Sequence, residues 1–132
     1  MCKVGDIIII DSYKDHNKTI SKHSFIVISD EGGKIEGCSY DFIANVLSSF
    51  KSDAQKERKL SYPGNFPITH DDVDTDPNNG KDGFVKADQL YYFNKENISY
   101  TVIGTINPDV FALLLKFVEN SEFDIIDIVD NL

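Results

Sequence analysis

The side chains best suited to acid–base chemistry are the histidines, of which the chain has three. His16 and His23 flank a polar segment near the N-terminus, and an imidazole titrates at about pH 6.5, so each ring can take up or release a proton near neutrality. The pair would allow acid–base chemistry. Alternatively, His23 is a partly buried structural residue at the edge of a strand. His70 is expected at the surface.

A dense group of basic residues, Lys51, Lys56, Arg58 and Lys59, is the other candidate for chemistry, and Arg58 is the sole arginine of the chain. The group is either the solvated face of a short helix or a local positive patch. The chain as a whole has a formal net charge of −9. Binding of RNA would therefore depend on such a patch, because phosphate contacts need Lys and Arg. The overall acidity favours solubility or a basic partner.

The composition predicts one globular domain over residues 1–132, with 41% hydrophobic residues. Cys2 and Cys38 lack the spacing of metal ligands and are expected to be reduced thiols. The alternating acids at 71–76 fail as an EF-hand loop, because a proline follows at once and the final glutamate is missing. No metal or cofactor is expected. The apolar run 7–10 is too short for a signal or a membrane span, so we expect a cytoplasmic protein.

Hydrophobic patterning predicts several short strands and two helices. The segment 40–51 is ambiguous, because its apolar residues recur at helical spacing but also alternate as in a strand. A polar loop is expected over 13–21, an acidic loop over 71–83 and an aromatic turn over 88–93. We expect strands at 7–10, 23–29, 84–86 and 99–106, a charged helix at 52–60 capped by Ser52, and a helix at 107–120 capped by Asn107.

This order of short strands with one closing helix indicates a mainly β fold, a small β-barrel with a C-terminal helix. Tyr91, Tyr92 and Phe93 would either stack on nucleobases or fill the interior of the barrel.

Four segments in this order resemble the MazF/PemK family of bacterial toxins. Val4–Ile8 is similar to the family's opening Gly-Asp strand, and His23–Ser29 to its second strand. Ala44–Ser49 resembles the third strand, which favours a strand over a helix at 40–51. Phe84–Phe93 resembles the segment before the last strand and helix. The chain would then carry an insertion over 52–83.

The resemblance implies an SH3-like barrel of the MazF/PemK/CcdB type that forms a homodimer with a groove across its interface. It also implies the toxin of a type II toxin–antitoxin system, an endoribonuclease that cleaves single-stranded RNA without a metal and is blocked by an antitoxin peptide. Such cleavage needs a base, groups that hold the developing charge on phosphorus, and an acid.

The same resemblance places His23 at the position of a family arginine and Ser48 at that of a threonine, and implies that these two are the catalytic pair. Histidine supplies acid–base chemistry but not the permanent two-pronged phosphate contact of arginine. Further substrate contacts are expected from Lys22, Ser49, His16 and Lys51.

Two alternatives remain open. The loss of the arginine, the net charge and the acidic tail at 122–132 favour a non-catalytic module that binds a protein partner, as a relative in the same barrel superfamily traps DNA gyrase. The second alternative is a degenerate toxin that has lost its activity and still binds its antitoxin.

Overall fold

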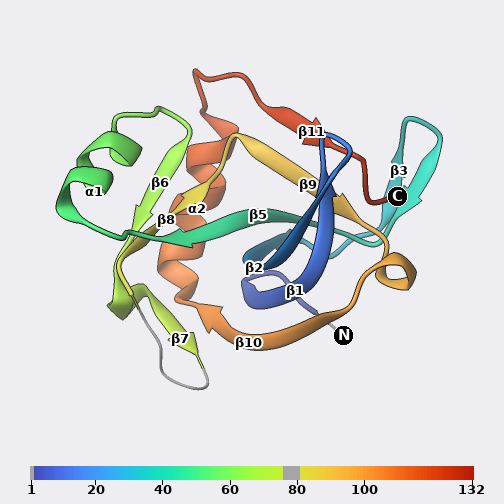
Figure 1. Ribbon diagram of the computed structural model, residues 1–132, viewed down its shortest axis with the longest axis horizontal. Helices are drawn as coiled ribbons and strands as arrows, with labels where there is room; N and C mark the ends of the chain where they lie inside the picture. The colour runs from blue at the N-terminus through green and yellow to red at the C-terminus, as the bar shows by residue number, and fades with distance from the viewer. Residues whose placement is uncertain (1, 76–80) are drawn as a thin grey trace.

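The computed structural model describes residues 2–75 and 81–132, and its course is shown in Figure 1. The strands are β1 (Asp6–Asp15), β2 (Lys18–Ser29), β3 (Gly33–Ile35), β4 (Cys38–Tyr40), β5 (Phe42–Ser49), β6 (Asn65–Ile68), β7 (Val73–Thr75), β8 (Gly83–Lys86), β9 (Gln89–Phe93), β10 (Tyr100–Ile106) and β11 (Ile126–Ile128). The helices are α1 (Asp53–Leu60) and α2 (Pro108–Glu119), with short 3₁₀ turns η1 (His70–Asp72) and η2 (Lys95–Asn97).

The fold is mainly β, as expected, and is built on one large sheet with the strand order β11-β9-β5-β2-β1-β10-β7. Strand β8 pairs with β5 and carries β6 on its far side, while β3 and β4 form a separate hairpin. All these pairs are antiparallel except β11 with β9. Among the described residues the end strands β11 and β7 do not pair with each other, so the sheet is not closed and the predicted barrel is not confirmed.

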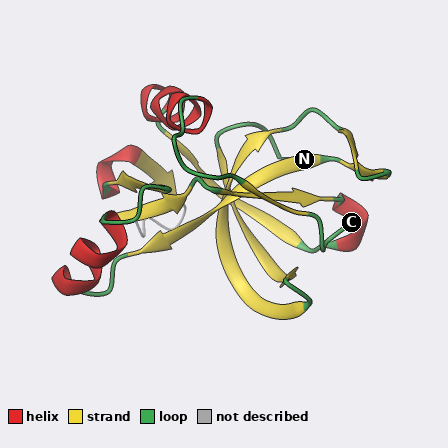
Figure 2. Cartoon of the chain, turned by 90° about the horizontal axis from the view of Figure 1, so that it is seen from above, coloured by secondary structure: helices red, strands yellow, loops and turns green. Residues whose placement is uncertain are grey.

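The sheet is nevertheless strongly curled. Phe42 in β5 and Tyr100 in β10 are three strand spacings apart in the ladder, which is about 14 Å in a flat sheet. Their ring centroids are only 5.9 Å apart. Figure 2 shows the curved strands from above, with α1 at one end of the long axis and both chain ends toward the other.

The isoleucine run 7–10 forms part of β1, as predicted, and it is apolar throughout because both faces of this strand are covered. Ile8 and Ile10 face the inside of the curl and are fully buried. Ile7 faces the other way and packs beneath α2. Successive side chains of a strand point to opposite faces, so a strand covered on both sides needs an uninterrupted apolar sequence.

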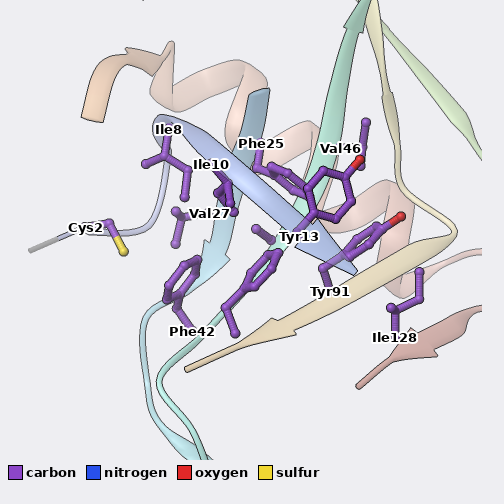
Figure 3. Close-up of a cluster of buried hydrophobic side chains, with 12 residues drawn as sticks. Cys2, Ile8, Ile10, Tyr13, Phe25, Val27, Phe42, Val46, Tyr91 and Ile128 are labelled. Atoms are coloured by element: carbon purple, nitrogen blue, oxygen red, sulfur yellow. The ribbon is translucent and has the colours of Figure 1, made fainter. Parts of the chain in front are cut away.

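The cluster inside the curl is rich in aromatic rings, and Figure 3 shows how these rings fill it. Phe25 contacts Tyr13, Tyr91 and Phe93 edge-on, at centroid distances of 4.9, 5.3 and 5.3 Å. Tyr91, Tyr92 and Phe93 are at most 8% exposed. Of their two predicted roles, the structure supports packing in the interior.

Two expected connections are wrong. The polar loop predicted over 13–21 is instead the continuation of β1 and β2 into a long hairpin, closed by His16 and Asn17, which both have positive φ. Two left-handed residues match the twist of a tight hairpin, but glycine is the usual signal for this turn. The aromatic turn predicted over 88–93 is strand β9, which pairs with β5.

Other predicted elements are confirmed. The ambiguous segment 40–51 contains strand β5, in agreement with the resemblance. Helix α1 begins after Ser52, whose side chain accepts a hydrogen bond from the Gln55 amide, and it has no buried residue. Helix α2 begins after Asn107 with proline in its first turn. The acidic loop expected at 71–83 contains η1 and β7, and its residues 76–80 lie outside the described residues.

In the described part of the chain, neither α-helix has the length and hydrophobicity needed to cross a membrane.

Helix α2 offers a matched test of the packing beneath it. Leu114 is fully buried in the cluster that α2 covers, whereas its neighbour Leu113 is 56% exposed. Replacing Leu114 by alanine is expected to lower the free energy of unfolding by about 2–5 kcal/mol, because a cavity remains under the helix. Leu113→Ala is expected to change it by less than about 0.5 kcal/mol. Urea denaturation of both variants measures the difference, and equal losses would contradict the placement of α2.

Candidate functional site

A groove of about 730 Å³ opens where β2, β5 and β8 meet helix α1. Strands β5 and β8 lie side by side, and α1 follows beyond the end of β5 (Figure 1). It is lined by Lys22, His23 and Ser24 from β2, Leu47, Ser48, Ser49, Phe50 and Lys51 from the end of β5, Gln55 and Lys59 from α1, and Lys81, Phe84 and Lys86 at β8.

The groove concentrates positive charge on an acidic chain. Five lysines line it, and no aspartate or glutamate does so among the described residues. The chain has 13 basic and 22 acidic residues, so eight bases and 22 acids are left for the rest. Like charges in a shared cleft repel one another and focus a positive potential, which favours an anionic ligand.

The strand register brings His23 and Ser48 together. Ser24 pairs with Leu47 across β2 and β5, so the antiparallel ladder places His23 opposite Ser48. Both side chains line the groove. Lys22, Ser49 and Lys51, which were expected to contact substrate, line it as well.

His16 is the exception, because it does not reach this groove. It lies at the closed end of the β1–β2 hairpin, where its ring contacts Asp15 at 3.1 Å. Seven residues separate it from His23, or roughly 20 Å of strand at about 3.3 Å per residue. The expectation of two imidazoles in one site assumed a loop over 13–21, whereas this segment forms the β1–β2 hairpin and His16 does not line the groove.

The ring of His23 is held in a defined state. Its Nδ1 accepts a hydrogen bond of 2.9 Å from the amide of Ser24. The neutral ring therefore carries its proton on Nε2 and donates from that atom. Burial of the ring lowers the pKa of His23 below its ordinary value, and the nearby charge of Lys86 lowers the pKa further. At pH 7 the groove thus contains a neutral imidazole among charged lysines.

The basic cluster predicted from sequence is divided by the fold. Lys51 and Lys59 line the groove, while Lys56 lines a neighbouring hollow of about 440 Å³, and Arg58 lines neither. Lys81 and Lys86, which complete the set of five lysines, were missed because they are distant in sequence from the cluster. Only the pairing of β8 with β5 brings them to it.

His70 lies beside this neighbouring hollow and is exposed, as expected. Its Nδ1 contacts Asp82 at 3.0 Å, and this hydrogen bond, together with the charge of Asp71, raises the pKa of His70 above its ordinary value. Since β5 and β8 lie between His70 and His23, the two rings do not share one site.

Asn45 fixes the backbone from which Lys86 projects. Strand β5 pairs with β9 through residues 42–44 and with β8 through residues 47–49. At the break between these two ladders, the buried Asn45 donates from Nδ2 to the carbonyl oxygens of Lys86, at 3.3 Å, and Gln89, at 2.8 Å. A buried carbonyl without a donor is costly, so this amide stabilises the interruption. Its own Oδ1 has no hydrogen-bond partner among the described residues.

The described residues contain no group of three or more histidine, cysteine or acidic side chains placed to hold a metal ion.

No protein-family model, no curated protein and no solved structure matches the chain.

The charge of Lys86 gives a direct test of the groove's electrostatics. In the folded protein the pKa of His23 is expected below its ordinary value of 6.5. Lys86→Gln is expected to raise this pKa, because an imidazolium is less costly when a nearby positive charge is removed, but burial keeps it below the ordinary value. NMR titration of the His23 ring protons measures both values. Lys34→Gln, in the separate β3–β4 hairpin, is the control that leaves the pKa unchanged.

Asn45→Asp tests the interruption of the ladder. The substitution keeps the shape of the side chain but replaces two donors by a buried carboxylate facing two carbonyl oxygens. We expect a loss of about 3–5 kcal/mol in unfolding free energy at pH 7. Burial raises the pKa of the introduced carboxyl in the folded state, so the loss diminishes as the pH falls and this group is protonated. Urea denaturation at pH 7 and pH 5 measures the difference in unfolding free energy between the variant and the wild-type protein. A difference that is larger at pH 5 than at pH 7 would contradict this role of Asn45.

Proposed function

We propose that the groove binds single-stranded RNA and that the chain is a metal-independent endoribonuclease, the toxin half of a toxin–antitoxin pair. The observation that carries the proposal is the meeting of five lysines in one cleft of a chain whose net charge is −9. Lysine side chains bind phosphates through charge and release counterions from the nucleic acid. The negative net charge of the chain repels RNA, so electrostatic attraction to RNA must come from the lysines of the groove.

The proposed reaction is an internal transesterification. The ribose 2′-oxygen forms a bond to phosphorus, the bond from phosphorus to the 5′-oxygen breaks, and a 2′,3′-cyclic phosphate and a free 5′-hydroxyl result. The 2′-hydroxyl loses one proton and the departing 5′-oxygen gains one. The lysines would hold the negative charge that develops on the phosphoryl oxygens.

His23 is the group best placed to take part. His23 lines the groove, and in the resting state its neutral ring carries the proton on Nε2. A neutral imidazole N–H can stabilise negative charge that develops on a substrate oxygen. To accept the 2′-hydroxyl proton at Nε2, the ring must release the Ser24 amide and carry its proton on Nδ1. Its lowered pKa keeps the ring neutral at pH 7, which a general base requires.

The resemblance to the MazF/PemK family supports this proposal because three of its four segments contribute residues to the groove. His23–Ser29 belongs to β2, Ala44–Ser49 to β5, and Phe84–Phe93 to β8 and β9. The same resemblance carries the further proposals of an SH3-like barrel, a homodimer, an antitoxin peptide in the groove and a cytoplasmic location.

RNA cleavage in the presence of EDTA tests the proposed function. The purified protein is expected to cut single-stranded RNA and to leave 2′,3′-cyclic phosphate ends. His23→Ala is expected to lower the rate by about 10²–10³, the cost of removing one donor to a developing oxyanion. Gel electrophoresis with end-group analysis measures both. Full activity of the variant would remove His23 from the site, and activity abolished by EDTA would contradict a metal-independent reaction.

Binding is measured separately with the same RNA. Substituting Lys22 or Lys86 by glutamine is expected to weaken binding and to reduce the slope of log K against log salt by about 0.7 for each lost phosphate contact. Lys34→Gln, outside the groove, keeps the wild-type slope. An unchanged slope in all three variants would place the RNA elsewhere.

A second function is favoured by one observation, the hydrogen bond from the Ser24 amide to His23 Nδ1, which leaves the resting ring without a free acceptor. A groove with cations and no base suits a non-catalytic module that binds an acidic protein segment, and a degenerate toxin would behave in the same way. Tight binding of an acidic peptide without any RNA cleavage would favour this function.

A further inference from the structure

Phe50 lies where the lysine-lined groove meets the neighbouring hollow, whose lining also includes Asp53 and Asp82. It follows directly after β5 and lines both the groove and the neighbouring hollow. Lys51 and Lys81 are shared by the two cavities in the same way, so an aromatic ring lies between two cations where the cavities meet. The ring is half-buried.

One side of this ring has a rigid support. Phe50 stacks on Phe84 with 5.4 Å between the ring centroids and 30° between the ring planes. Phe84 is 2% exposed and belongs to β8, which pairs with β5. The amide of Phe50 also donates to the carbonyl oxygen of Asp82 at 3.1 Å. The ring is therefore held in place before any ligand arrives.

The cation next to the Phe50 ring can be displaced by a ligand. The ammonium group of Lys56, on α1, lies 5.8 Å from the ring centroid. A cation over a partly exposed ring is held only weakly, and the lysine side chain is long and flexible. A larger planar group that stacks on the ring would displace it and bury more apolar surface.

Proteins that bind single strands combine a positive groove along the backbone with aromatic rings on which bases stack. Building on the function proposed above, we propose that Phe50 is the stacking platform for a nucleobase of the bound RNA, with Lys51 and Lys81 contacting the phosphates on either side of that base. The subsite recognises the flat face of a base, so it tolerates all four bases.

The other described aromatic side chains do not offer such a place. Of the residues considered for stacking from the sequence, Tyr91 and Phe93 fill the interior of the curled sheet. Tyr92 points to the other face of β9, where its ring is covered by Tyr40 and its hydroxyl donates to Asp127. Tyr62 is 53% exposed but does not line the groove. Tyr62 is therefore a suitable control position.

The chain contains no tryptophan, so a single introduced indole reports on one position alone. In Phe50→Trp, addition of single-stranded RNA is expected to quench the fluorescence by stacking, and an abasic RNA of the same length is expected not to. Tyr62→Trp is the matched control whose emission stays constant with either ligand. Equal quenching of Phe50→Trp by both RNAs would overturn the proposal, because a phosphate effect would then explain the signal.

Affinity gives an independent measurement. Phe50→Ala is expected to weaken binding of single-stranded RNA roughly 5- to 150-fold. Phe50→Tyr, which keeps the ring, retains the wild-type affinity. Inorganic polyphosphate is the second ligand, and both variants are expected to bind it as the wild-type protein does, which also shows that the groove is intact. A parallel loss for polyphosphate in Phe50→Ala would overturn stacking as the cause.

The outcomes separate this inference from the proposed function. If RNA binds and is cleaved but Phe50→Ala changes neither its affinity nor its preference over abasic RNA, the stacking subsite is wrong and the proposed function stands. If stacking is observed and no cleavage occurs, the subsite stands and the catalytic part of the proposed function fails. If the wild-type protein does not bind RNA, both are wrong.

Discussion

The structure depends on the way in which strand β5 is shared. Along one edge β5 pairs with β2, but along the other its first half pairs with β9 and its second half with β8. The chain between β8 and β9 must therefore leave the ladder and return, and the buried amide of Asn45 supplies the donors that this departure requires. Both the aromatic interior and the groove follow from this division, because β9 contributes rings to the first and β8 contributes cations to the second.

The electrostatics of the groove differ from those of the chain as a whole. Lysines from β2, from α1, from the end of β5 and from β8 meet in a cleft where no described acid lines the wall. Repulsion between these lysines raises the free energy of the folded protein. A bound anion would reduce this repulsion. The neutral state of His23 fits this arrangement, since a second proton on the ring would add to the same repulsion.

The sequence predicted those elements that local chemistry determines. Strand β1 was predicted correctly from its isoleucine run. Helices α1 and α2 were predicted correctly from their capping residues, Ser52 and Asn107, and from the proline at the start of α2. Periodicity could not decide whether 40–51 is a helix or a strand, because β5 is covered on both sides and its apolar residues fit both helical spacing and strand alternation. The hairpin at His16 was missed because neither left-handed residue of its turn is glycine. His23, Ser48 and Lys51 were singled out from the sequence and line one groove, but Lys81, Lys86 and Phe50 gather there only through the pairing of β8 with β5.

Helix α1 has no buried residue, so the helical side of the groove is less firmly anchored than the side formed by the strands. The strands form a stiff wall that is anchored in both hydrophobic clusters. The helix is held by its ends and by few contacts with β6, so its local unfolding costs less free energy than that of the sheet. A polyanion bound to the sheet that also contacts Lys59 and Gln55 would link helix α1 to the sheet and restrain it. Restraining the helix would then lower the net free energy of binding, so the affinity of the groove would depend on how firmly α1 is held.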